Sequence, residues 1–251
     1  MTVSVLLALA GPLQSWGHDS RFTVRSTGSE PTKSGVLGLV ASALGRDRDA
    51  NLSDLSALAF AVRTEQPGVL VEDFQVSLSM DKTQAMPLSR RYYLADARFT
   101  AALSGNDALV QEIADALARP VYPLFLGRRS CPPARPVSMR GIHDGTNGTG
   151  LLEGRSVEVL RSLPAQISPV MNRRLRNQET LSLPLHADTT PDDPQGVTIR
   201  DLPVSYSAKH RHYLPRTYAA LKPVVLHNEL HVPKIHTNPG LDEHHTWDGL
   251  E

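Results

Sequence analysis

The residues best suited to ligand chemistry lie in the stretch 126–137, which reads Leu-Gly-Arg-Arg-Ser-Cys-Pro-Pro-Ala-Arg-Pro-Val. It belongs to a longer interval, residues 116–143, that holds five arginines and no acidic residue. A guanidinium group offers a rigid fork of donors that matches a phosphate, and a glycine lets the backbone approach a ligand closely. The pattern predicts that Arg128 and Arg129 bind a polyanion, with Arg140 as a further candidate.

Residues 28–34 form a second candidate anion site, at the start of a predicted helix. They read Gly-Ser-Glu-Pro-Thr-Lys-Ser, but Thr32 stands where a nucleotide-binding P-loop requires a glycine before the lysine. The pattern therefore argues against an NTPase. Lys33 and Ser34 open the helix, whose free N–H groups and positive dipole end can hold an RNA phosphate. Capping of the helix accounts for the same residues without any ligand.

Arg90, Arg91 and Tyr92 combine guanidinium groups with an aromatic ring at the base of a predicted hairpin. That mixture suits single-stranded RNA, because bases stack on rings and phosphates meet guanidinium groups. The alternative is a half-buried strand, with a tyrosine in the core and the arginines reaching outward to water. We expect at least one of these arginines to bind RNA.

The polar connection at residues 11–30 supplies three further candidates. Gln14 and Trp16 directly follow a predicted central strand, and Arg25 lies later in the same loop. A connection this long is more often functional than idle in a compact domain. A tryptophan there can stack on a ligand or cover the sheet, and core packing is its commoner role. We predict RNA contacts for all three residues.

The composition narrows the classes of function. The 251 residues include 26 basic and 26 acidic side chains, so the formal net charge is zero. This balance argues against a free-standing, nonspecific DNA binder, but not against a subunit that holds nucleic acid inside an assembly. The single cysteine fits a reducing cytoplasm, and no apolar run reaches the roughly 18 residues of a membrane span. The ten histidines show no metal-ligand pattern, so we predict neither a metal nor a cofactor.

Metal-independent RNA cleavage is the alternative function. It needs a general base, a general acid and a cation near the reacting phosphate. Residues of suitable type are Lys209, His210, Tyr213 and Tyr92. Nothing in their spacing shows that they converge, so the sequence favours a binding role over a nuclease.

Hydrophobic periodicity indicates the elements that must position these residues. Residues 2–10 are apolar on both faces and are predicted to be a central strand. Thr32 caps the first helix, Asn106 or Asp107 caps the second, and the polar stretch 80–89 forms a hairpin tip. This order predicts an α+β, ferredoxin-like β-α-β-β-α-β domain with an inserted hairpin. The remaining predicted elements are a helix at 33–45, a helix ending before Pro120, and strands at 57–64, 69–79, 90–103 and 121–126.

The C-terminal third has weaker patterns. Residues 155–161 and 197–206 are predicted strands, and the glycine-rich residues 141–150 are a predicted loop. Residues 184–196 carry three prolines and three aspartates and are predicted to be exposed. Residues 236–251 are predicted to form a loose tail.

Several segments together resemble the CasD family, whose members hold the 5′ handle of the guide RNA in type I-E CRISPR Cascade. The resemblance covers roughly residues 1–137, and the first two long motifs are the most specific. The matching segments are Leu9-Ala10-Gly11-Pro12-Leu13-Gln14-Ser15-Trp16-Gly17, then Arg25, Thr27 and Gly28, then Pro31-Thr32-Lys33-Ser34-Gly35-Val36-Leu37-Gly38-Leu39, then Tyr93-Leu94-Ala95-Asp96-Ala97-Arg98-Phe99, then Leu126-Gly127-Arg128-Arg129-Ser130-Cys131-Pro132.

The resemblance implies a RAMP-type ferredoxin-like domain over residues 1–140, with a β-hairpin thumb near 74–95. We expect a β-rich extension at 141–235 and a flexible tail at 236–251. The family role is that of a non-catalytic RNA-binding subunit, which caps the 5′ handle of the crRNA and docks on the CasC backbone and the large CasA subunit. The resemblance also implies that this subunit contacts target DNA only within the assembled complex. A relative in type I-C systems cleaves RNA, so the endoribonuclease alternative stays open.

Overall fold

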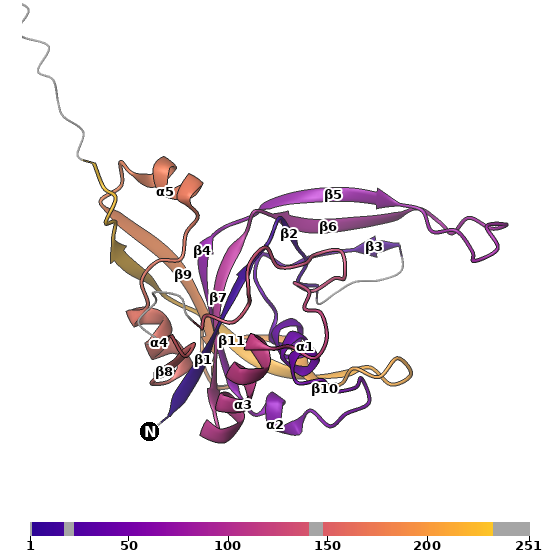
Figure 1. Cartoon of the computed structure of the whole chain (residues 1–251), viewed down its shortest axis with the longest axis horizontal. Coiled ribbons are helices and arrows are strands. Elements are labelled where there is room, and N and C mark those ends of the chain that lie inside the picture. The colour runs from indigo at the N-terminus through magenta and orange to yellow at the C-terminus, as the bar shows by residue number, and fades with distance from the viewer. Residues whose placement is uncertain (1, 18–22, 141–147, 233–251) are drawn as a thin grey trace, which may run out of the picture.

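The computed structural model describes residues 2–17, 23–140 and 148–232. A seven-stranded sheet has the order β10-β11-β9-β4-β7-β1-β8, and β2, β3, β5 and β6 form a smaller sheet (Figure 1). The strands are β1 Val3–Ala10, β2 Leu13–Gln14, β3 Val24–Arg25, β4 Ala59–Gln66, β5 Val69–Gln75, β6 Ser89–Ala95, β7 Arg98–Gly105, β8 Leu151–Glu153, β9 Thr180–Asp188, β10 Val197–Ser205 and β11 His212–His227. The helices are α1 Lys33–Ala43, α2 Ser53–Ser56, α3 Asp107–Ala118, α4 Ser156–Ser162 and α5 Pro169–Leu175.

Strand β1 runs through the middle of the large sheet with both faces buried. It pairs antiparallel with β7 on one side and with β8 on the other. Leu7 and Leu9 join the core that α1 and α3 cover, whereas Leu6 and Ala8 join a second core that α4 covers. Because side chains alternate along a strand, one apolar run supplies both cores. The prediction of a central first strand is confirmed.

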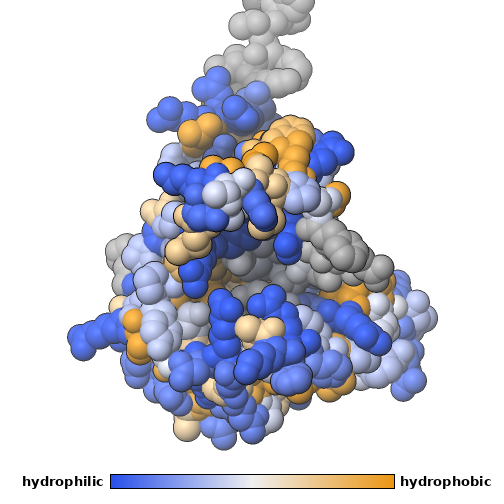
Figure 2. Space-filling model, turned by 90° about the vertical axis from the view of Figure 1, so that its right-hand side faces the viewer, coloured by the Kyte–Doolittle hydropathy of each residue, from blue (hydrophilic) through white to orange (hydrophobic). Residues whose placement is uncertain are grey.

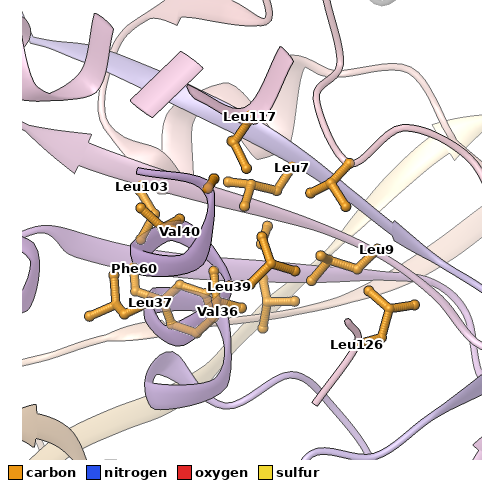
Figure 3. Close-up of a cluster of buried hydrophobic side chains, with 14 of the residues drawn as sticks. Leu7, Leu9, Val36, Leu37, Leu39, Val40, Phe60, Leu103, Leu117 and Leu126 are labelled. Atoms are coloured by element: carbon orange, nitrogen blue, oxygen red, sulfur yellow. The ribbon is translucent and has the colours of Figure 1, made fainter. Parts of the chain in front are cut away.

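Side-chain caps fix the starts of the two helices over the first core. The hydroxyl of Thr32 accepts a hydrogen bond from the backbone N–H of Gly35 at 3.2 Å. The side chain of Asn106 accepts one from the backbone N–H of Leu109, also at 3.2 Å. Both predicted helix starts are confirmed. Figure 3 shows the apolar side chains of these helices and of the large sheet meeting in the core between them.

The pattern predicted as one strand over 90–103 is two strands in two different sheets. Strand β6 ends at Ala95 and β7 begins at Arg98, and Asp96 between them has a φ of 56°. This left-handed residue turns the chain out of the small sheet and into the large one. Strands β5 and β6 pair in register along their whole lengths and form a hairpin that projects from the body of the protein, called the thumb hairpin below (Figure 1).

The strand predicted at 121–126 is absent, and this prediction is wrong. The segment instead closes the end of α1, because the N–H groups of Val121 and Tyr122 donate to carbonyl oxygens in the last turn of that helix. Pro123 has no N–H to give to a ladder, which disfavours a strand here. Strand β8 takes the place beside β1.

Two further predictions in the C-terminal third are wrong. Residues 156–162 form helix α4 rather than a strand, and the Glu158 carboxylate accepts a hydrogen bond from the N–H of Arg155 at its start. Residues 184–188 complete strand β9, in which Leu185 and Ala187 are buried, so only the later part of 184–196 is a polar connection. Strand β10 confirms the predicted strand at 197–206.

Strands β9, β10 and β11 extend the large sheet beyond β4 and bring the turn between β10 and β11 back toward α1 (Figure 1). The C-terminal third and the first domain thus share one sheet. Residues 141–147 of the predicted loop, and the predicted tail at 236–251, lie outside the described residues. None of the described helices is long and apolar enough to cross a bilayer.

Candidate nucleic-acid interface

A cleft of about 440 Å³ lies between strand β3 beside the base of the thumb hairpin, the segment 125–128, helix α1 and the turn that joins β10 to β11. We call it the thumb cleft. Figure 2 shows the face from which the hairpin tip and this turn project; the surface is hollowed between an upper and a lower mass, and hydrophilic residues border the hollow. One aspartate lines the cleft among its described residues. The arginines that line it are Arg25, Arg46, Arg48, Arg128 and Arg211.

Arg128 ties together the segments that form the upper wall of the cleft. Its guanidinium donates to the backbone oxygens of Tyr92 at 3.1 Å, Arg25 at 2.8 Å and Ser26 at 3.3 Å. It also lies over the ring of Tyr93, 4.8 Å from the ring centre. All of these partners are uncharged, so none of them neutralises the guanidinium. Arg128 therefore holds β3 against β6 and still contributes a full positive charge to the cleft.

Gly127 lets the segment that carries Arg128 and Arg129 approach the backbone near Ser15. It has a φ of 90°, and a Cβ atom there would lie 1.7 Å from the backbone oxygen of Ser15. The N–H of Ser15 in turn donates to the carbonyl of Leu126 at 3.0 Å. Only glycine fits such a contact. The close approach predicted at this position is made to the protein's own backbone rather than to a ligand.

Arg25 and Arg91 lie side by side where β3 runs parallel to β6. Laterally paired residues point to the same face of a sheet, and residues two apart on a strand do so too. Arg25 and Arg91 therefore share the face of the hairpin that carries Tyr93, over which Arg128 lies. Arg25 lines the thumb cleft, whereas Arg91 lies beside it outside the lining. Asp73 is the partner of Arg91 on β5, and its carboxylate accepts a hydrogen bond from Gln75 at 2.6 Å.

Arg90 and Tyr92 belong to the opposite face of the thumb hairpin and do not line the cleft. Arg90 pairs with the Glu72 carboxylate, and its guanidinium lies 5.8 Å from the centre of the Phe74 ring. The same carboxylate accepts from the Tyr92 hydroxyl, which raises the pKa of the phenol. The structure thus separates this pair from Arg91, although the three are consecutive in sequence.

Gln14 and Trp16 are interior residues, so their side chains are not exposed for the predicted contacts with RNA, although Trp16 lies at the wall of the thumb cleft. Their exposed fractions are 0% and 1%. The Gln14 amide donates to the carbonyl of Ala97 at 2.7 Å, and its oxygen accepts from the indole N–H of Trp16 at 3.0 Å. The indole ring packs so closely on α1 that a Cβ atom at Gly35 would lie 2.9 Å from it. The two side chains join the first loop to the core.

The N–H groups at the start of α1 are already occupied by an internal anion, which corrects the predicted phosphate site at Lys33, whereas Ser34 lines the thumb cleft. The Asp201 carboxylate accepts from the backbone N–H groups of Lys33 at 2.7 Å and Ser34 at 2.8 Å. Lys33 is 4% exposed, and its ammonium group pairs with Asp188 at 2.8 Å. Arg216 contacts both carboxylates at 2.7 Å. These residues, here called the buried charge cluster, carry two positive and two negative charges and leave no cation for RNA.

The two remaining predicted ligands lie outside the cleft lining. Arg129 is exposed next to Arg128, and no partner for its side chain is recorded within the described ranges. Arg140 pairs with Asp115 on α3 at 2.5 Å and donates to the carbonyl of Thr149 at 3.5 Å. The pair lowers the pKa of the Asp115 carboxyl. The structure therefore does not bring Arg140 to the other arginines.

Sequence reasoning did not identify the lower wall of the cleft as a binding surface, although it considered Tyr213 for a nuclease. This wall includes Arg48, Arg211, Tyr206 and Tyr213. The two tyrosine rings meet edge to face at 6.4 Å, and the Tyr206 hydroxyl donates to a backbone carbonyl in the first turn of α1 at 2.5 Å. The available signal was a basic run, residues 209–212, between two tyrosines in a polar turn.

The residues considered for a nuclease do not supply a general base in the cleft. Tyr213 lines the cleft and Tyr92 does not. Burial raises the pKa of the Tyr213 phenol, and the Glu72 hydrogen bond raises that of Tyr92, so both stay protonated at neutral pH. The described lining of the cleft holds no histidine. Nor does the described part of the chain contain three or more His, Cys, Asp or Glu residues grouped to hold a metal ion.

Comparison with known proteins identifies the family of the chain. The sequence matches a family model described as "CRISPR-associated protein (Cas_Cas5)" over residues 4–218. The chain belongs to this family. The CRISPR system Cascade subunit CasD of Escherichia coli (strain K12) is 35% identical over 156 residues, which cover 53% of this chain and 68% of that one.

Two solved structures extend the similarity of this family member to nearly its whole length. "CRISPR RNA-guided surveillance complex" contains a chain that is 29% identical, with a TM-score of 0.71, and the match covers 92% of this chain and 95% of that one. "Crystal structure of Cas protein" is 33% identical, with a TM-score of 0.65, and covers 92% and 97%. The mixed, sheet-rich fold is therefore shared with members of such complexes.

Proposed function

We propose that this Cas5-family chain is an RNA-binding subunit of a type I-E Cascade complex and that its thumb cleft holds the 5′ handle of the crRNA. The pairing of Arg25 and Arg128 in the lining of the cleft carries the proposal, because neither guanidinium has a carboxylate partner among the described residues. Arg91, which lies beside Arg25 on the same face of the thumb hairpin, adds a positive charge next to the cleft. Phosphates would lie on these guanidinium groups, and unstacked bases would lie against Tyr213 or Phe125 in the same cleft.

We propose further that the fold is ferredoxin-like. The chain order β1-α1-β4 and β7-α3-β8, with the thumb hairpin inserted between β4 and β7, supports this assignment. The spatial order β4-β7-β1-β8 places the first and third strands of that motif at the centre. Helices α1 and α3 contribute to a single core, as two helices on one face of the sheet do.

The thumb hairpin is the surface that we expect to dock on the CasC backbone subunit, and the neighbouring faces on CasA. Hydrophobic side chains along it are mostly exposed: Leu70 is 59% exposed, Phe74 56% and Leu78 58%. A soluble chain rarely displays so many apolar side chains together unless a partner covers them. Protein docking by the hairpin leaves the arginines at its base for the RNA.

We propose a binding role rather than catalysis. The protonated phenols and the cleft lining without histidine support a site that lacks a general base. The alternative is a metal-independent endoribonuclease for CRISPR repeat RNA. Incubation of the purified chain with labelled repeat RNA in chelator separates the two, because specific cleavage would contradict the binding role.

The cleft itself is tested by reversing charges whose side chains have no hydrogen-bond or ion-pair partner among residues 2–17, 23–140 and 148–232. We expect the double variant Arg25→Glu and Arg211→Glu to bind a 5′-handle oligonucleotide at least about tenfold more weakly than the parent. The matched control reverses two exposed arginines outside the cleft, Arg161→Glu and Arg173→Glu, which changes the net charge equally. Equal loss of affinity in both variants, measured by fluorescence anisotropy, would contradict the proposed site.

A further inference from the structure

The segment 126–137 supplies one arginine to the thumb cleft and another to a second pocket. This second pocket has a volume of about 460 Å³ and lies between the ends of β1, β4 and β6 and the start of α5. Arg98, Arg135 and Arg174 line it, and we call it the arginine pocket. Asp96 is the one acidic residue among its described lining residues.

The guanidinium group of Arg135 lacks a hydrogen-bond acceptor at one of its nitrogen atoms among the described residues. Its side chain is half-buried, and its Nε atom is buried without a hydrogen-bond partner among the described residues. Burial and the neighbouring Arg98 guanidinium both lower the pKa of Arg135. Glu65 attracts it from nearby, but the two Glu65 oxygens already accept from Arg63 at 2.8 Å and from the N–H of Gln166 at 2.9 Å. Among the described residues, the pocket therefore holds three arginines against one aspartate, and the Nε–H of Arg135 has no acceptor.

The other lining residues indicate what kind of anion fits. The walls are aliphatic, with prolines, valines and a methionine, and no aromatic ring appears among the described lining residues. Val69 is 67% exposed and Val170 is 59% exposed, so apolar surface borders the charge. The bases of single-stranded nucleic acid stack on aromatic side chains, which line the thumb cleft but not the described part of this pocket. Arginines amid apolar surface are typical instead of protein interfaces.

We infer that the arginine pocket receives an acidic side chain from an aliphatic segment of a partner protein in the complex. The carboxylate would accept from Arg98 and Arg135, and the flanking aliphatic residues would cover Val69 and Val170. The inference rests on the chain being a subunit of a protein assembly. It does not depend on RNA lying in the thumb cleft, because the two sites share no lining residue.

The variant Arg135→Met tests the inference in the full chain, because it keeps the aliphatic stem and removes the charge. We expect the free chain to melt at the same or a higher temperature, since a half-buried cation without an acceptor is lost. Association with the purified partner subunits of the complex, without RNA, should weaken about tenfold or more. The affinity for a 5′-handle oligonucleotide should change less than about twofold. Arg173→Met, an exposed neighbour outside the pocket, is the control.

Each contrary outcome overturns the inference. Weaker RNA binding with unchanged protein association would show a phosphate site, and no change in either would show no ligand. A melting temperature below that of the control would make Arg135 a structural residue. A photo-crosslinker in place of Val170 gives a direct check in the assembled complex: the attached peptide must come from a partner protein and contain Asp or Glu, and changing that acid to its amide must weaken association.

Discussion

Two regions of this molecule hold basic residues that differ in the charge of their partners. In the buried charge cluster, Lys33 and Arg216 lie within 2.8 Å of carboxylate oxygens from β9 and β10. At the base of the thumb hairpin, Arg128 makes contacts of similar length, but only to backbone carbonyls and an aromatic ring. The charges of the first region cancel, whereas the second region keeps a net positive charge.

The difference shows that the partner of a cation, and not the cation itself, decides whether it can hold RNA. A carboxylate partner neutralises the charge of the cation. When the pair is buried, removal of either member leaves the other as an uncompensated charge and destabilises the fold. A carbonyl partner fixes the geometry of a guanidinium while leaving its charge available. Two kinds of variant should therefore separate stability from RNA binding.

The largest effect on stability should come from Asp201→Asn. The carboxylate is 1% exposed and holds Arg216 and two N–H groups at the start of α1. Loss of its charge leaves a buried guanidinium without one of its partners, so we expect a loss of about 3 kcal/mol in the free energy of unfolding. Urea denaturation measures it, with the exposed Asp192→Asn as control. RNA affinity per folded molecule should stay unchanged; if it fell, the cluster would belong to the interface.

Arg128→Met should affect both properties. It removes hydrogen bonds to three backbone carbonyls, and we expect a loss of about 2 kcal/mol in stability. It also removes a charge from the cleft, so affinity for the handle oligonucleotide should fall as well. Denaturation and anisotropy on the same preparation measure the two. A loss of stability with full RNA affinity would mean that Arg128 only positions the hairpin.

A smaller and cleaner effect is expected from Arg25→Gln, whose side chain has no recorded partner within the described residues. Stability should stay within about 0.5 kcal/mol of the parent, as at most exposed sites. If Arg25 contacts one phosphate, the slope of log affinity against log salt should decrease by about 0.7. Titrations at several salt concentrations measure it. An unchanged slope would place Arg25 outside the RNA contact.

The smallest effect concerns the ion pair of Arg46 with Asp54 at the edge of the thumb cleft. Asp54 is 45% exposed, and solvent screens the pair, so Asp54→Asn should cost less than about 1 kcal/mol at neutral pH. Arg46 lowers the pKa of the Asp54 carboxyl below its ordinary 3.8. The contribution of the ion pair to the free energy of unfolding is therefore fully present above about pH 4. It is lost as the pH falls through the lower pKa of Asp54 in the folded state. A difference between parent and variant that persisted below that range would exclude this cause.

Local signals explain which parts of the fold the sequence predicted. Thr32 and Asn106 cap the helices that they were predicted to cap, and alternating apolar residues marked β1 and β10. Strand β9 was hidden because Pro184 and His186 interrupt its pattern, although Leu181 to Ala187 alternate in burial. Local patterning alone does not reveal which strand pairs with which.

The predicted clustering of cations is observed only where no carboxylate of the chain itself pairs with them. Arg25 and Arg128 line one cleft, as the concentration of arginine suggested, and Arg91 lies beside Arg25. The start of α1 did not become a phosphate site, because Asp201 reaches it from 168 residues further along the chain. No pattern within residues 28–34 could reveal that partner. Polar side chains far apart in sequence can meet only through the tertiary fold.

The most direct test of the account is a map of ultraviolet crosslinks between RNA and protein in the purified complex. Aromatic residues that stack on bases form such adducts, and the thumb cleft offers Phe125 and Tyr213. We predict adducts on peptides that carry these residues, and their loss in the double variant Arg25→Glu and Arg211→Glu. Adducts confined to peptides that line the arginine pocket, or none on this chain at all, would contradict the claim that the thumb cleft holds the RNA.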